Sequence, residues 1–287
     1  MRTSKKTSPW SMVYLVLVLL FIYAPILFII VFSFNDGASM SNWKGFSLRW
    51  YDKLFHDPII IRATGVTLVV GVLSAFFATV LGTFGAIGIH SMTKKKRFAV
   101  MSITQLPVYN PDLITGISLM LVFNVVKELL SRMGITMQLG FGTMLIAHIT
   151  FNIPYVILSV LPRLKQSSSS LYEAALDLGA SPSYALWKVT IPDIMPGIIT
   201  GAILAFTMSL DDFVVTFFTR QGIQNLSTQI YATVRRGISP EINALSAIMF
   251  VVVLTLLLVV NIRGSREDNK MKKRKNLPKS AEVSPAR

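Results

Sequence analysis

The chain has 287 residues, of which 52% are apolar, its mean hydropathy is +0.58, and Lys and Arg outnumber Asp and Glu by 28 to 14. The basic residues lie in short loops and tails between apolar runs, which argues against nucleic-acid binding and for a membrane protein. Because the chain has no cysteine, disulfides and thiol chemistry are excluded, and its three histidines are spaced too widely for a helical metal site.

Several apolar runs of about twenty residues are long enough to cross a hydrocarbon core of about 30 Å. The first follows Arg2, Lys5 and Lys6 in the layout of a signal sequence, but its length and poor cleavage site predict a retained span. We therefore predict an all-α integral membrane protein of about six transmembrane helices. They are expected near residues 12–34, 63–89, 98–126, 141–161, 195–218 and 244–262.

The basic residues predict the orientation of the spans. An even number of spans puts both termini on one side, and the run from Lys94 to Arg97 assigns that side to the cytoplasm. The tail at 263–287 is basic, contains two prolines and has almost no apolar residues, so we expect it to be disordered and to contact anionic lipid. The predicted location is the inner or plasma membrane, with both termini cytoplasmic.

The outer loop after the first span is rich in aromatic residues. Within it, Leu48, Tyr51, Leu54 and Phe55 recur at helical spacing. This pattern predicts a short helix at the outer headgroups, and an ordinary aromatic belt is the alternative.

The connection from Pro162 to Asp193 has the signals of a folded elbow. Ser170-Leu171-Tyr172-Glu173 reads as a capping box, so a helix is expected over 171–178, ending at Gly179 in a left-handed conformation. Ser181-Pro182 then supplies the N-cap and first residue of a second helix. Ala174, Ala175 and Leu178 would form a small face suited to a groove on a cytosolic partner.

This elbow resembles a known motif. Glu173-Ala174-Ala175, then Gly179, then Val189-Thr190-Ile191-Pro192 is similar to the EAA motif of type I ABC importer permeases, with Val189 and Ile191 as the departures. The resemblance implies a coupling helix that docks on a separate ATP-hydrolysing subunit. The chain lacks a phosphate-binding G-x-x-x-x-G-K-[ST] loop, which agrees with a transport subunit that is not an enzyme. The alternative is that Glu173 only caps its helix.

Three acidic residues fall inside predicted spans, where a charge is costly. Asp112 is expected near the middle of the third span, and Asp211 and Asp212 in the outer half of the fifth. Such carboxylates need a cation, a base from a partner subunit, water or protonation. A cationic substrate such as a polyamine meets that need, with Phe213 and Phe217 adding cation–π contacts.

Structural alternatives exist for each of these polar residues. Asn110-Pro111-Asp112 reads equally as a helix restart with its acid at the positive end of the helix dipole. The Asp211-Asp212 pair is alternatively a hydrogen-bonding element at a subunit interface. His148 and Asn152, four residues apart, are expected to join helices by hydrogen bonds.

The order of motifs over about residues 14–262 resembles the spermidine/putrescine permeases, most of all the PotC-type subunit. The matching stretches are Asn42 to Phe46, Trp50-Tyr51, Pro111-Asp112, His148 to Phe151, Glu173 to Ala180, Ser209 to Asp212 and Ser239 to Glu241. The resemblance implies a PotA-type ATPase dimer, a PotB-type second permease and a PotD-type binding protein as partners. It implies no cofactor and no catalytic or metal-binding residue.

The resemblance also implies a division of the chain and a function. Residues 1–11 would be a cytoplasmic tail, 12–61 an added first span with its outer loop, 62–262 the type I permease core, and 263–287 a tail. The expected activity is ATP-driven import of polyamines by alternating access. The alternatives are a related importer for ferric iron, thiamine, sulfate or sugar, or a cation channel lined by Asp112 and Asp211.

Overall fold

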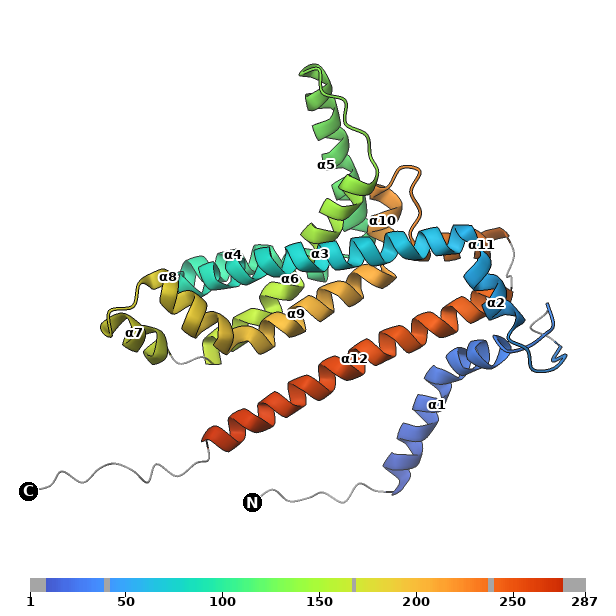
Figure 1. Cartoon of the computed structure of the whole chain (residues 1–287), viewed down its shortest axis with the longest axis horizontal. Helices are drawn as coiled ribbons and strands as arrows, with labels where there is room; N and C mark the ends of the chain where they lie inside the picture. Colours follow the sequence, from blue (N-terminus) through green and yellow to red (C-terminus); the bar gives the residue numbers. More distant parts are fainter. Residues whose placement is uncertain (1–8, 39–41, 167–168, 237–239, 276–287) are drawn as a thin grey trace, which may run out of the picture. The chain divides into compact units, whose positions relative to one another are not determined.

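A computed structural model describes residues 9–38, 42–166, 169–236 and 240–275 (Figure 1). The regular structure in these residues is helical, apart from one antiparallel bridge between Asn35 and Phe46. The helices are α1 (Pro9–Phe32), α2 (Arg49–His56), α3 (Pro58–Ser91), α4 (Lys94–Tyr109), α5 (Asp112–Arg132), α6 (Phe141–Gln166), α7 (Ser169–Asp177), α8 (Pro182–Ala185), the π-turn η1 (Leu186–Thr190), α9 (Ile191–Asp211), α10 (Val214–Thr219), α11 (Leu226–Arg236) and α12 (Pro240–Lys275).

Five helical segments in the described residues are long and apolar enough to cross a membrane. They are Trp10–Phe32, Pro58–Ser91, Asp112–Arg132, Phe141–Gln166 and Pro182–Asp211. The sixth predicted span, 244–262, lies within α12, which contributes a shorter apolar helix, Pro240–Thr255. The all-α, multi-pass membrane fold predicted from the sequence is therefore confirmed.

Two predicted spans have the wrong limits because each contains a helix break. The predicted third span, 98–126, is divided at Asn110-Pro111 into α4 and α5. The predicted fifth span, 195–218, ends at Asp211, and α10 starts separately after an extended residue at Asp212. Hydropathy does not register these breaks, because the residues on both sides of each are apolar.

The predicted disorder of the C-terminal tail is wrong for its first part. The helix α12 continues to Lys275, so residues 263–275 are helical. Their Lys, Arg, Glu and Met residues favour helix, and no proline interrupts them. Residues 276–287, and residues 1–8 of the predicted N-terminal tail, lie outside the described part of the chain.

The chain divides into two compact units, of which the first comprises residues 1–64 and 229–253. In this unit the predicted outer helix is present as α2. The Trp50 indole is buried and donates a 2.7 Å hydrogen bond from Nε1 to the carbonyl of Asn35. Lys53 of α2 forms an ion pair with Glu241, at the start of α12. The outer loop is thus held by a buried aromatic residue and an ion pair.

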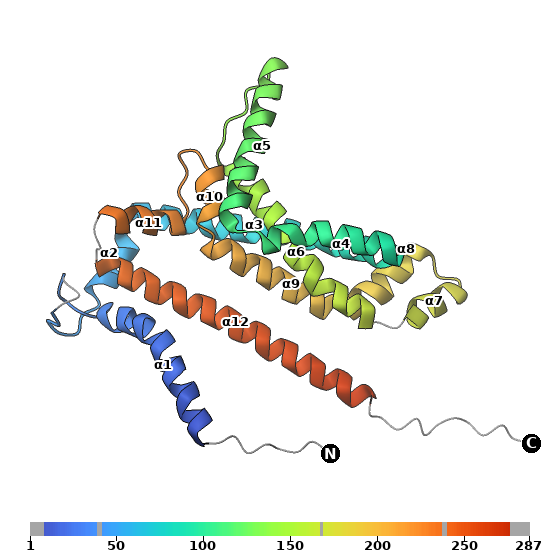
Figure 2. The same cartoon turned by 180° about the vertical axis from the view of Figure 1, so that it is seen from behind.

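The second unit comprises residues 65–228 and 254–287, and its core is built around α6. Residues of α3 and α9 run along α6 (Figure 2). Val156 of α6 is fully buried against glycines of both neighbours. A Cβ atom at Gly82 of α3 would lie 2.7 Å from Val156 Cβ, and one at Gly201 of α9 would lie 3.2 Å from Val156 Cα. The two glycines therefore allow three backbones to pack closely, as in membrane helix interfaces generally.

This packing predicts opposite results for two glycines of the same helix. We expect Gly82→Ala to destabilise the subunit by about 1–3 kcal/mol, because the new methyl group overlaps Val156 in a filled core. Gly88→Ala is the matched control, since a Cβ atom there meets nothing within 4 Å and alanine favours helix. Thermal unfolding in detergent measures both variants. Equal stability of the two would contradict the packing argument.

Candidate functional site

The elbow predicted from the sequence is present and begins with α7. After α7 the chain turns at Gly179, whose φ of +88° is the left-handed conformation expected for it. The amide of Gly179 donates to the carbonyl of Leu176, and the amide of Ala180 donates to that of Ala175. These two bonds form a Schellman motif, which satisfies the last carbonyls of α7.

The start of α7 differs slightly from the prediction. The helix begins at Ser169, so Ser170 lies within its first turn and not at the expected N-cap position. The side chains of residues 167–171 lie outside the described part of the structure, so the capping box stays a prediction.

The second half of the elbow leads directly into a membrane span. The Ser181 hydroxyl accepts a 3.3 Å hydrogen bond from the amide of Tyr184, and Pro182 starts α8, as predicted. A π-turn, η1, then joins α8 to α9. Pro192 has no amide hydrogen and would crowd the carbonyl four residues earlier, which accounts for a widened turn just before it. The second half of the elbow and α9 therefore form one continuous helical rod, Pro182–Asp211.

The elbow exposes much of its apolar surface. Leu178 is 89% exposed, and Tyr184 and Trp187 are more than half exposed. Among the motif residues, Glu173 and Ala174 are exposed and Ala175 is half-buried. Exposed apolar groups beside small residues are typical of a surface that a partner covers.

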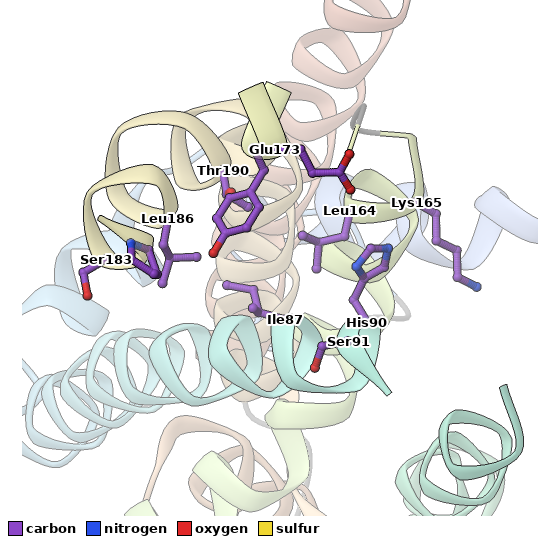
Figure 3. A pocket seen from close by; sticks show the side chains of 11 residues that line it. Ile87, His90, Ser91, Leu164, Lys165, Glu173, Ser183, Leu186 and Thr190 are labelled. Atoms are coloured by element: carbon purple, nitrogen blue, oxygen red, sulfur yellow. The ribbon is translucent and has the colours of Figure 1, made fainter. Parts of the chain in front are cut away.

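A pocket of about 650 Å³ lies between the elbow and the ends of two spans (Figure 3). Its walls come from the end of α3, the end of α6, and α7, α8 and η1. The lining residues are Ile87, His90, Ser91, Leu164, Lys165, Tyr172, Glu173, Pro182, Ser183, Leu186 and Thr190. The sequence motifs had pointed only to lining residues of the elbow itself, and the contributions of α3 and α6 were missed.

Asp212 lies at the break between α9 and α10 and is fully engaged in hydrogen bonds. Its carboxylate accepts from the amides of Val215 at 3.2 Å and Thr216 at 2.8 Å, and from the Thr216 hydroxyl at 2.9 Å. His148 Nε2 lies 3.3 Å from Asp212 Oδ2, and both side chains are buried. The carboxylate thus caps α10 at its positive end and has a histidine partner.

His148 connects three elements through this cluster. Its Nδ1 lies 2.6 Å from the Ser209 hydroxyl of α9, and its Nε2 lies 2.8 Å from the Thr216 hydroxyl of α10. Asn225 adds hydrogen bonds from Nδ2 to the carbonyl of Asp212 and to the Thr216 hydroxyl. The prediction that His148 joins helices is confirmed, but the partners Ser209, Thr216 and Asn225 were missed by sequence reasoning.

Asn152 does not join helices in the same way. It is fully buried on α6, and its side-chain nitrogen and oxygen have no hydrogen-bond partner among the described residues. The predicted hydrogen bonds of Asn152 are therefore absent from the part of the chain that the structure describes.

Asp112 and Asp211 lie at helix ends instead of within continuous spans. Asp112 is the first residue of α5 and Asp211 the last of α9, and both are exposed. The expected position of Asp112 near mid-span is wrong, and the alternative of a helix restart is confirmed. The two carboxylates are close enough to interact electrostatically, and Asp112 also interacts with Tyr155 of α6. Two exposed acids at the ends of separate helices are thus within electrostatic range of each other, and Asp211 also lies at the negative end of the α9 dipole.

Comparisons with known proteins agree with this architecture. A family model described as the binding-protein-dependent transport system inner membrane component matches residues 78–273. The putrescine transport system permease protein PotI of Escherichia coli K12 is 39% identical over 246 residues, which cover 84% of this chain and 86% of that protein. The spermidine/putrescine transport system permease protein PotC is 36% identical over 241 residues in both Escherichia coli K12 and Haemophilus influenzae, covering 84% of this chain and 87% and 90% of those proteins.

A solved structure shows the same fold. A bacterial ABC transporter for import of the acidic polysaccharide alginate contains a chain that matches with a TM-score of 0.70 at 22% identity, covering 90% of this chain and 94% of that one. The family model and the relatives, together with this fold, define a membrane-spanning transport subunit, and not an enzyme. The chain belongs to the binding-protein-dependent transport system inner membrane component family.

Proposed function

We propose that this chain is a permease subunit of an ABC importer for polyamines such as putrescine and spermidine. The observation that carries the substrate is the position of Asp112 and Asp211 as exposed acids at two helix ends, within electrostatic range of each other. Polyamines carry several ammonium groups on an apolar chain, and two exposed carboxylates with a helix C-terminus favour such a ligand. The names of the relatives, which refer to putrescine and spermidine transport, support the same substrate class.

The residues at the two helix breaks have different proposed roles. Asp211 and Asp112 would contact the substrate, and Tyr155, whose phenol is within electrostatic range of Asp112, would be a further contact. Asp212 is engaged in capping α10, so we assign it a positioning role instead of the substrate contact expected from the sequence. Discontinuous helices with binding groups at their ends are a common plan of transporter sites.

The elbow is proposed to couple this site to ATP hydrolysis. Glu173, Ala174, Ala175 and Gly179 would dock on a PotA-type ATPase dimer, and because the second half of the elbow is continuous with α9, its displacement reaches Asp211 along one rod. The other partners would be a PotB-type permease and a PotD-type binding protein. Alternating access would then arise because the transmembrane helices can pack in two arrangements, one open to each side of the membrane. ATP binding would shift the equilibrium between these two arrangements.

The proposed topology follows from the sequence. Both termini would be cytoplasmic, residues 62–262 would form the permease core, and 12–61 would add a lateral span. The positive run from Lys94 to Arg97 supports this orientation, because it follows α3 directly.

Uptake by the complete transporter in proteoliposomes tests the substrate site. We expect Asp211→Asn and Asp112→Asn each to reduce polyamine uptake by about 10- to 100-fold, since a charge-assisted contact contributes about 1.5–3 kcal/mol. ATPase stimulation by the loaded binding protein should persist. Glu128→Gln is the matched control, because Glu128 is an exposed acid at the other end of α5.

Three results would contradict the proposal. Unchanged uptake in both aspartate variants would remove the substrate role. Parallel loss of uptake and ATPase stimulation would point to a structural role. Polyamine flux without ATP would favour the cation channel instead.

A further inference from the structure

The pocket beneath the elbow has a lining of which the proposed transport function uses only Glu173. Its charged and polar side chains gather on one side, where the Glu173 carboxylate and the His90 imidazole lie above and below Leu164 and the Lys165 side chain leads outward (Figure 3). Ile87 and Leu186 provide apolar surface away from these groups. A ligand of this pocket therefore needs both charged and apolar parts.

The charges in and around the pocket are of both signs. His90 interacts electrostatically with Lys165 and with Arg97 of α4. The Arg97 guanidinium is held in place by hydrogen bonds to the carbonyls of Ile89, His90 and Met92. The positive charges of Lys165 and Arg97 disfavour a polycation as the ligand, while the negative charge of the Glu173 carboxylate disfavours a simple anion. The combination is complementary to a zwitterion.

The position of the pocket indicates where such a ligand comes from. The spans α3 and α6 both end at its wall, at Ser91 and Gln166. In the proposed topology this is the level of the cytoplasmic lipid headgroups, where basic pockets between helices bind lipids. A volume of about 650 Å³ is also in the usual range of small-ligand sites, about 300–1,000 Å³.

We propose that this pocket binds the headgroup of an aminophospholipid, which carries a phosphodiester and a primary ammonium group. Lys165 and the Tyr172 hydroxyl would donate to the phosphate, and Glu173 would accept from the ammonium. The start of an acyl chain would cover Ile87 and other apolar lining residues. A bound lipid would thereby connect the elbow to the ends of two spans.

Photolabelling tests the site in the complete transporter, reconstituted in phosphatidylcholine nanodiscs with a photoactivatable phosphatidylethanolamine. We expect labelled peptides from the ends of α3 and α6, and Lys165→Gln should reduce this labelling by about tenfold. Ser183→Phe should reduce it independently by filling the pocket from α8, where Ser183 is exposed. Lys94→Gln is the matched control, since Lys94 is an exposed lysine of α4 outside the lining.

Competition distinguishes the sources of this headgroup. Unlabelled phosphatidylethanolamine should compete, whereas phosphatidylcholine, which has no N–H donor, and phosphatidylglycerol, which has no ammonium, should compete at least about tenfold less well. Equal competition by all three lipids, or labelling unaffected by Lys165→Gln and Ser183→Phe, would overturn the proposal. Equal competition by soluble glycerophosphoethanolamine or by spermidine would overturn the lipid as ligand. Because the readout is labelling, its outcome is independent of polyamine transport.

Discussion

Asp212→Ala should lower the stability of the subunit by about 3–5 kcal/mol, because it leaves two backbone amides and a hydroxyl of α10 without their acceptor and removes the partner of buried His148. The carboxylate caps two amides of α10 and lies 3.3 Å from His148 Nε2, with 6% of its side chain exposed. Removing it leaves buried donors on both α6 and α10 without their acceptor. Unfolding in detergent monitored by circular dichroism gives the free-energy change.

The neighbouring aspartate provides the control for this prediction. Asp211→Ala should change stability by no more than about 0.5 kcal/mol, because Asp211 is exposed at the end of α9. A double-mutant cycle of Asp212→Ala with His148→Ala should show a coupling energy of about 1–3 kcal/mol. If both aspartate substitutions lowered stability equally, or if the cycle showed no coupling to His148, the assignment of Asp212 to positioning and Asp211 to substrate contact would be wrong.

Gly179→Val is expected to abolish ATP-driven uptake while leaving the subunit in the membrane. Gly179 has a φ of +88°, where a β-branched residue is strained, although no atom lies within 4 Å of a Cβ atom there. The effect therefore arises from the redirected chain between α7 and α8, and not from a clash. Gly179→Asn should be milder, because asparagine adopts this conformation more easily. Uptake, stimulated ATPase activity and membrane abundance are the three measurements.

A second glycine separates backbone strain from coupling. Gly134 has a φ of +77° and also meets nothing within 4 Å, but it follows α5 and is far from the elbow in sequence. Gly134→Val should lower the stability of the subunit about as much as Gly179→Val does, but ATP hydrolysis should remain coupled to uptake. Glu173→Ala, which introduces no strain, should lose stimulated ATPase activity and uptake together. Retained transport in both Gly179→Val and Glu173→Ala would refute the coupling role of the elbow.

The elbow was the feature most completely predictable from sequence. Its geometry depends on local signals, namely a glycine at a helix end and a serine followed by a proline. The Schellman bonds at Gly179 and the cap at Ser181 agree with those signals. The π-turn before Pro192 was not foreseen, although the missing amide of that proline was a usable signal.

The two helix breaks were less predictable than the elbow. They also changed the expected positions of Asp112, Asp211 and Asp212. A hydropathy window averages across Asn110-Pro111 and across Asp212, so apolar neighbours hid both breaks. The local signal of a proline before Asp112 supported the alternative that the structure confirms. No comparable local signal marks Asp212, because its partner His148 is distant in sequence.

The sequence by itself determined the membrane class, most of the spans, the elbow with Gly179 and the family motif, because hydropathy and capping act over a few neighbouring residues. Only the tertiary structure decided that Asp212 is buried against His148, while Asp211 and Asp112 are exposed at helix ends within electrostatic range of each other. It also decided that His90, Lys165 and Glu173 line one pocket. These pairings join segments that are remote in the chain, and helix packing alone brings them within reach of one another.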